Sequence, residues 1–278
     1  MNESKYKEKP LERDDYAEPC CPFAKPNSPS PIPLPRVIGK LDEYLGKNDM
    51  AAAERHLAYW LAETEAGGDD RGRLTILNEQ IGLFRKTEQE AKATAAAEEA
   101  LALAESLGYA GTVTMGTTLI NAATAYRAFG QTEKALPCYE RARALYESLL
   151  PANDERLGGL YNNMALTVTA LGRYDEASAL YEKALAVMAG VEHGEADRAI
   201  TYCNMADLAA ARDGEEAAEA EIGCCLDRAL ELLDTPTLPR NGYYAYVCEK
   251  CAPTFGYYGY FAAEAELMKR RNTIYERS

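Results

Sequence analysis

The sequence predicts an all-α protein: a superhelical solenoid of about six helical hairpins with a disordered, proline-rich N-terminal tail. Three observations support this prediction. Eight of the thirteen prolines lie within residues 1–36, which separates that segment from the rest of the chain. From Val37 onward, small residues recur with a period of 42 residues, and glycines and tyrosines recur in the same register.

Residues 1–36 form the predicted tail and end in "KPNSPSPIPLPR". Proline fixes φ and lacks a backbone donor, so we expect disorder passing into a polyproline-II strand and no helix. The extended segment "PSPIPLPR" is also a candidate for docking on the protein's own surface.

The repeat is clearest over residues 111–190, where alanines, a glycine and a tyrosine return 42 residues later. The matched pairs are Ala123 and Ala165, Ala135 and Ala177, Ala142 and Ala184, Gly130 and Gly172, and Tyr139 and Tyr181. Fainter copies lie upstream and downstream. Within the predicted solenoid, 37–278, the approximate repeats are 37–68, 70–108, 111–150, 153–190, 195–234 and 241–278.

Each repeat is expected to be a pair of crossing helices, A and B. Small residues at the crossing let the two backbones approach, and aromatic side chains such as Tyr126 and Tyr139 fill the space beside them. Gly130 and Gly172 are expected to end helix A, because they adopt the required backbone shape easily. One hairpin cannot bury its own apolar faces, so the hairpins must stack.

This spacing, and the segment "LGRYDEASALYEKAL" at 171–185, resemble the tetratricopeptide repeat. The 42-residue period resembles the kinesin light chain variant of that repeat. The resemblance implies a right-handed superhelix whose concave groove binds proteins or peptides, and it implies no cofactor.

Asparagines recur at one position of helix A. Asn121, Asn163 and Asn204 each lie two residues before the small crossing residue, which rotates them about 160° away from it, toward the groove. In proteins of the resembled type, such asparagines hydrogen-bond the backbone of an extended peptide. The same register gives the full predicted peptide-binding set: Asn78, Glu79, Asn121, Thr124, Arg127, Asn162, Asn163, Cys203, Asn204, Asp207, Glu249, Lys250 and Tyr257.

An alternative stays open for these asparagines, because an amide on helix A can also bond to the next repeat and only stitch the stack. The register is also imperfect. In the second repeat Glu79 occupies the position and Asn78 lies one residue early, and in the last repeat the position holds Lys250.

The net charge of −14 lies entirely in residues 37–278. Such an acidic body repels phosphate backbones, so no nucleic-acid partner is expected. We expect a neutral or basic ligand, with Arg127 and Lys250 meeting its acidic groups and Asp207, Glu79 and Glu249 its basic ones. No apolar run is long enough to cross a bilayer and no secretory leader is evident, so a cytoplasmic location with reduced thiols is expected.

Two further segments have a plain and a functional interpretation. "CEKC" at 248–251 has metal-ligand spacing, but no second such pair follows and the chain has two histidines, so we expect ordinary thiols, no metal and no enzyme. The stretch 241–261 holds six tyrosines and two phenylalanines, and Pro253 and Gly256 are expected to distort its helix. It is either an aromatic cap on the last repeat or a binding surface, at the end of the groove or in a dimer contact, and the oligomeric state is not predicted.

The sequence therefore predicts a scaffold or adaptor module that holds an extended peptide in its groove. The alternatives are a peptide-sensing or autoinhibited regulatory solenoid, and a structural scaffold that oligomerises through its tyrosine-rich end.

Overall fold

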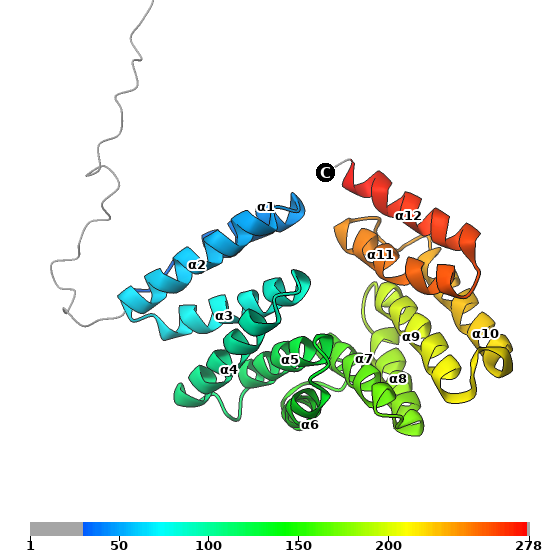
Figure 1. The fold of residues 1–278 in the computed structure, drawn as a ribbon, viewed down its shortest axis with the longest axis horizontal. Coiled ribbons are helices and arrows are strands. Elements are labelled where there is room, and N and C mark those ends of the chain that lie inside the picture. The colour runs from blue at the N-terminus through cyan, green and yellow to red at the C-terminus, as the bar shows by residue number, and fades with distance from the viewer. Residues whose placement is uncertain (1–29, 277–278) are drawn as a thin grey trace, which may run out of the picture.

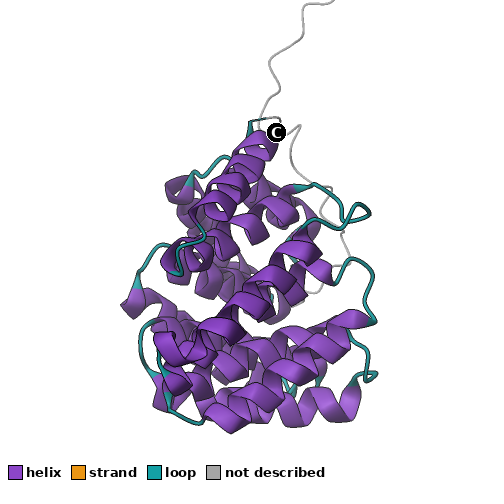
Figure 2. Ribbon diagram, turned by 90° about the vertical axis from the view of Figure 1, so that its right-hand side faces the viewer, coloured by secondary structure: helices purple, strands orange, loops and turns teal. Residues whose placement is uncertain are grey.

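Neighbouring helices pair throughout the chain. The computed structural model describes residues 30–276, and over that range it contains helices joined by short loops and no strand (Figure 2). The twelve described helices form six consecutive hairpins, which confirms the predicted all-α solenoid (Figure 1). They are α1 (Leu34–Gly46), α2 (Met50–Gly67), α3 (Asp70–Lys86), α4 (Glu90–Ser106), α5 (Val113–Ala128), α6 (Thr132–Leu149), α7 (Glu155–Ala170), α8 (Tyr174–Ala189), α9 (Glu195–Asp213), α10 (Glu215–Leu233), α11 (Gly242–Tyr257) and α12 (Phe261–Tyr275).

The hairpins stack so that their first helices share one face. α3 packs on α5, α5 on α7, α7 on α9 and α9 on α11. The second helices α2, α4, α6 and α8 each pack on their partner and on the next first helix, whereas α10 packs mainly on its partner α9. Figure 1 shows the resulting curve, with α3, α5, α9 and α11 toward its inside and α4, α6 and α10 toward its outside. The inner face is therefore built from the helices that carry the asparagines.

Alanine occupies the helix crossings and is buried there. Tyr139 and Tyr181, which share a register position, are fully buried beside the crossings. The hydroxyl groups of Tyr139 and Thr124 lie 2.9 Å apart, which gives the buried phenol a partner. The register alanines with at most 3% exposure are Ala93, Ala100, Ala123, Ala135, Ala142, Ala165, Ala177, Ala184, Ala206 and Ala218.

Gly130 and Gly172 end α5 and α7 as expected, each with φ of 73°. The amide of Gln131 donates to the carbonyl oxygen of Tyr126, and the amide of Arg173 donates to that of Val168. These bonds close the helix ends in the form that a left-handed residue permits. The α5–α6 and α7–α8 hairpins therefore share the same turn between their two helices.

The first helix begins earlier than expected. The prediction that residues up to 36 exclude a helix is wrong for 34–36, because α1 begins at Leu34 and takes Pro35 in its first turn, where a missing backbone donor costs nothing. Before it, the Ser30 amide donates to the Gly67 carbonyl oxygen, and the Ile32 amide donates to the Asp69 carboxylate. Ser30 and Ile32 are thus held at the α2–α3 turn, and residues 34–36 belong to α1. The rest of the predicted disordered tail, 1–29, lies outside the described residues.

The first helix of the last hairpin contains a proline and a glycine. Pro253 and Gly256 do not end the helix, because α11 runs without a break from Gly242 to Tyr257. Pro253 lies near the C-terminal end of α11, and buried neighbours, Cys251, Ala252 and Phe255, anchor this part of the helix. Between residues 30 and 276, no helix has both the length and the apolar character needed to cross a membrane.

Because α5 packs closely on α6 at Gly116, we expect any side chain at this position to destabilise the fold. A Cβ there would lie 2.4 Å from a ring carbon of Tyr146, which is buried. Although alanine favours helices by about 1 kcal/mol over glycine, we expect Gly116→Ala to lower the free energy of unfolding by about 1–3 kcal/mol through overpacking. Urea denaturation followed by circular dichroism measures this.

Gly82→Ala in α3 is the matched control, because a Cβ at that position meets nothing within 4 Å. We expect it to stabilise the protein. Equal or greater stability of Gly116→Ala would contradict the packing described here.

Candidate functional site

A cavity of about 370 Å³ lies on the inner face of the superhelix, and we call it the groove pocket. Its lining comes from the second to the sixth hairpins, so it exists because the solenoid curves. The residues that line it are Arg85, Thr124, Arg127, Gly158, Gly159, Asn162, Asn163, Leu166, Met188, Asp197, Ile200, Thr201, Cys203, Asn204, Tyr243, Tyr246, Lys250, Cys251 and Thr254.

The groove pocket brings together part of the set expected from the sequence. Those in it are Thr124, Arg127, Asn162, Asn163, Cys203, Asn204 and Lys250. Those that do not line it are Asn78, Glu79, Asn121, Asp207, Glu249 and Tyr257.

Most of the asparagines bond to one another across neighbouring hairpins. The amide nitrogen of Asn121 donates to the side-chain oxygen of Asn78 over 2.9 Å, and that of Asn204 donates to the side-chain oxygen of Asn162 over 3.0 Å. Asn78 also donates to the Leu74 carbonyl oxygen and to the Thr118 hydroxyl. These four asparagines therefore join α3 to α5 and α7 to α9, as the stitching interpretation predicts.

Asn163 is different, although it shares the register of Asn121 and Asn204. The residue of the preceding hairpin that would receive its amide is Ile120, which has no polar side chain. No described residue forms a hydrogen bond with the half-buried Asn163 side chain, and this side chain lines the groove pocket. Its amide is therefore available to a ligand.

Several of the other expected residues have partners within the chain. The Asp207 carboxylate accepts from the Tyr258 hydroxyl over 3.0 Å, and Glu249 pairs with Arg271 over 3.1 Å. Tyr257 is 70% exposed and donates its hydroxyl to Glu215 over 2.6 Å. These contacts tie the last hairpin together and to the one before it.

Arg85 also lines the groove pocket, although it is not among the residues predicted from the sequence. The signal was present, because Arg85 lies 42 residues before Arg127 and so occupies the same place in the last turn of helix A. Neither arginine forms an ion pair with a described carboxylate, and the same is true of Lys250. Three unpaired cations therefore meet in one cavity of an acidic protein.

Aromatic and acidic groups from α9 and α11 form another wall. Tyr243 stacks on Tyr246 with ring centroids 6.1 Å apart, and the Lys250 ammonium lies 5.5 Å from the Tyr246 ring centroid. The Tyr243 hydroxyl donates to Asp197 over 2.6 Å. Burial raises the pKa of Asp197 and so disfavours its charged form. Asp197 is the one carboxylate among the described lining residues.

The thiols of the groove pocket are buried. Contact with Cys251 and burial both raise the pKa of Cys203, which disfavours a reactive thiolate. Cys248 and Cys251 of "CEKC" are fully buried in the C-terminal core. Between residues 30 and 276, no group of three or more histidine, cysteine or acidic side chains is arranged to hold a metal ion.

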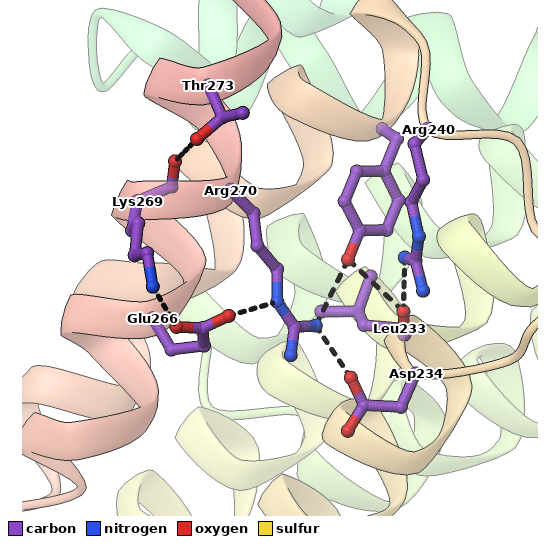
Figure 3. A network of polar contacts seen from close by, with 8 residues as sticks. Leu233, Asp234, Arg240, Glu266, Lys269, Arg270 and Thr273 are labelled. Carbon is purple, nitrogen blue, oxygen red and sulfur yellow. Dashed lines mark hydrogen bonds and ion pairs between the residues drawn. The ribbon is translucent and has the colours of Figure 1, made fainter.

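A second cavity, of about 730 Å³, lies between the α10–α11 loop and α12. Its central cation, Arg270, donates to Asp234, Glu266 and the Tyr244 hydroxyl, and Arg240 donates to the Leu233 carbonyl oxygen (Figure 3). Arg240 also lies over the Tyr244 ring, 4.1 Å from its centroid. This network holds the last helix in place, so its charges are engaged in the fold.

The unequal partners of the asparagines predict unequal stabilities. Asn121→Ala leaves the side-chain oxygen of Asn78 without its donor, and we expect a loss of about 1 kcal/mol in the free energy of unfolding. Asn163→Ala breaks no bond within the described chain, so its stability should stay within about 0.5 kcal/mol of wild type. Parallel urea denaturation curves compare them, and similar losses in both would refute the distinction.

The carboxyl group of Glu79 is expected to make the stability of the fold depend on pH. It is half-buried and burial raises its pKa above the ordinary 4.5, with the Asp42 charge adding to the shift. The folded state therefore holds this proton more tightly than the unfolded state and loses stability as pH rises from 4.5 through the raised pKa. Glu79→Gln should raise the melting temperature by a few degrees at pH 7 and leave it unchanged well below pH 4.

Glu249→Gln is the control, because Glu249 pairs with Arg271. We expect no stabilisation from it at pH 7. A constant effect of Glu79→Gln across the pH range would exclude the carboxylate as its cause.

Comparisons with known proteins agree with this geometry. The family model of the tetratricopeptide repeat matches residues 72–148 and 156–233, more than half of the chain. No functionally curated protein matches the sequence.

Two similar solved structures are of the nearly identical TPR-like repeats of a putative kinesin light chain from Podosopora anserina. One is 18% identical with a TM-score of 0.52, and the match covers 73% of this chain and 94% of that chain. The other, a single-substitution variant of those repeats, is 18% identical with a TM-score of 0.53, and the match covers 74% of this chain and 97% of that chain. The likeness is one of fold. The chain belongs to the tetratricopeptide-repeat family.

Proposed function

We propose that this protein is an adaptor that holds an extended segment of a partner in the groove pocket. Tetratricopeptide repeats generally mediate protein–protein interactions. The proposed contact with an extended segment rests on Asn163. Its unpaired side-chain amide lines the groove pocket, whereas Asn121 and Asn204, at the same position of the repeat, bond to other asparagines.

The groove pocket offers what a peptide backbone needs. An amide side chain both donates and accepts, so Asn163 can bond to a peptide group of any sequence. Thr254 and Thr124 add hydroxyls to the lining, and Met188, Leu166 and Ile200 add apolar surface. In their mutual bond Asn204 uses one amide hydrogen and keeps the other, and Asn162 keeps both of its amide hydrogens, so the two residues can make secondary contacts.

This proposal narrows the peptide-binding set that the sequence predicts. Contact with the partner is assigned to Asn163, Thr124, Arg127 and Lys250, with Asn162, Asn204 and Cys203 beside them. The chain acts as a binding module without catalysis, and a cytoplasmic location stays a prediction of the sequence.

The alternative functions are constrained by particular contacts. Ser30 and Ile32 bond at the α2–α3 turn and none of residues 30–36 lines the groove pocket, so an occupant from the predicted tail would come from residues 1–29. In the tyrosine-rich end, the hydroxyls of Tyr243, Tyr257 and Tyr258 donate to acidic residues of α9 and α10. These bonds join the last hairpin to the fifth, which supports the interpretation of this stretch as a cap.

Selection from a random twelve-residue peptide display library tests the proposal. Peptides bound by the full chain are synthesised, and their affinities for wild type and Asn163→Ala are measured by fluorescence polarisation. We expect Asn163→Ala to weaken binding by about 3- to 10-fold, the range of one hydrogen bond.

Asn272→Ala on α12 is the matched control, because Asn272 bonds to Arg271 outside the groove pocket. It should bind as wild type does. A library that yields no binder, or equal binding by wild type and Asn163→Ala, would refute the proposed contact.

A further inference from the structure

The exposed side of α2, in the first hairpin, is largely apolar. Tyr59 is 57% exposed there, and no other large apolar side chain between residues 30 and 67 is exposed. A helix at the surface of a soluble protein normally turns a charged or polar side to water. This side of α2 is therefore expected to have a cover. Its exposed residues, which we call the α2 face, are Arg55, Ala58, Tyr59, Ala62, Glu63 and Ala66.

A row of aromatic rings joins the α2 face to the core of the first hairpin. The centroids of the Tyr59 and Trp60 rings lie 5.3 Å apart, in an edge-on arrangement. The Trp60 and His56 centroids lie 6.4 Å apart, and those of His56 and Tyr44 of α1 lie 5.6 Å apart. Trp60 is half-buried, so part of its ring stays accessible to a covering segment. Proteins that bind proline-rich segments do so on aromatic side chains of this kind.

The chain enters the described structure beside these rings. The Ser30 amide donates to the Gly67 carbonyl oxygen over 2.9 Å. A Cβ at Gly67 would lie 2.9 Å from the Ser30 carbonyl oxygen, so glycine is what admits the segment this closely. Gly67 lies four residues after Glu63 and seven after Trp60, which places all three on one side of α2. Residues 1–29 therefore join the solenoid at the C-terminal end of the α2 face.

The segment that precedes Ser30 has the chemistry to cover such a face. Residues 19–29 lie outside the described residues and read "PCCPFAKPNSP". Their four prolines favour an extended chain that loses little entropy on docking. The last part, "PNSP" at 26–29, consists of residue types that form turns. The stretch before it contains one aromatic residue, Phe23, and one charged residue, Lys25.

We propose that residues 19–25 fold back after a turn at 26–29 and dock on the α2 face of the same chain. Phe23 packs on Tyr59 and Trp60, and the prolines cover the exposed alanines. Among the described residues, no hairpin precedes the first one to cover this side, and the terminal repeats of solenoids need a cap. The docked segment supplies it.

The length and charge of the segment suit this contact. Seven extended residues reach about 22 Å, whereas the eight-residue separation of Tyr59 and Gly67 corresponds to a helix rise of about 12 Å. Glu63 has no ion-pair partner among the described residues, and Lys25 supplies one. Covalent attachment keeps the local concentration of the segment high, so individually weak contacts suffice.

A tail held on the α2 face is kept away from the groove pocket. No residue of α1 or α2 lines that pocket. The docked segment therefore leaves the pocket open to a partner, which distinguishes this inference from an autoinhibited solenoid. It does not depend on the peptide contact proposed above.

Trp60 reports on the α2 face without a label, because the chain has one tryptophan. Acrylamide quenching of its fluorescence compares the wild-type chain with Phe23→Ser. We expect the substitution to lower the docking constant at least about tenfold, the equivalent of one buried aromatic ring. The quenching constant should therefore rise, and the emission maximum should move to longer wavelength. Phe23 lies outside the solenoid, so the variant should keep the fold.

Tyr6→Ser is the matched control, because it removes an aromatic ring from the same tail but outside residues 19–29. Its tryptophan fluorescence should be quenched as in wild type. Circular dichroism checks that both variants keep their helical content.

Photocrosslinking locates the docked segment. The chain is expressed with p-benzoylphenylalanine in place of Tyr59, irradiated and digested, and the crosslinked peptides are identified by mass spectrometry. We expect a product of single-chain mass in which position 59 is joined to a peptide from residues 19–29. The same photoreactive residue in place of Asn163, in the groove pocket, should capture no peptide of the tail.

Three kinds of result would overturn the inference. The first is equal quenching of wild type and Phe23→Ser, or an equal rise in Tyr6→Ser. The second is the absence of a tail peptide at position 59 or its capture at position 163, which would place the tail in the groove pocket. The third is a crosslinked product of twice the chain mass, which would assign the α2 face to a second copy.

Discussion

The close crossing of two helices at alanine is the constraint on which the rest of the structure depends. Ala135 and Ala142 are fully buried, and a larger side chain at either would push α5 and α6 apart. A hairpin formed in this way cannot bury both of its faces, so the next hairpin must cover it. Repeated stacking of hairpins produces the curve, and residues from five hairpins meet in the groove pocket on its inner face.

Polar contacts between hairpins then fix their spacing. On the inner face, Asn121 bonds to Asn78 and Asn204 bonds to Asn162. On the outer face, exposed ion pairs such as Lys92 with Glu54 link successive hairpins, each worth little by itself. The groove pocket, by contrast, gathers three cations without an ion-pair partner among the described residues, together with the free amide of Asn163.

The fold was predictable because its signal is local and repeated. Alanines, glycines and tyrosines returning every 42 residues specify a helix crossing without reference to distant parts of the chain. The start of α1 was missed, since a proline in the first turn resembles a proline that excludes a helix. The asparagine position was found on the inner face, but its occupants have two roles. Asn163 is free only because the preceding hairpin offers Ile120 where another would offer an amide.

The sequence by itself determined the hairpins and their order, because these follow from spacing along one chain, but it gave only part of the set of residues that line the groove pocket. Tertiary structure decided which of those residues meet. Arg85 and Lys250 are far apart in sequence, and the curvature summed over several hairpins brings them to one cavity. It also decided the charge of that cavity. The net charge of −14 sums the whole chain, whereas the charged residues that line the cavity are Arg85, Arg127, Lys250 and Asp197.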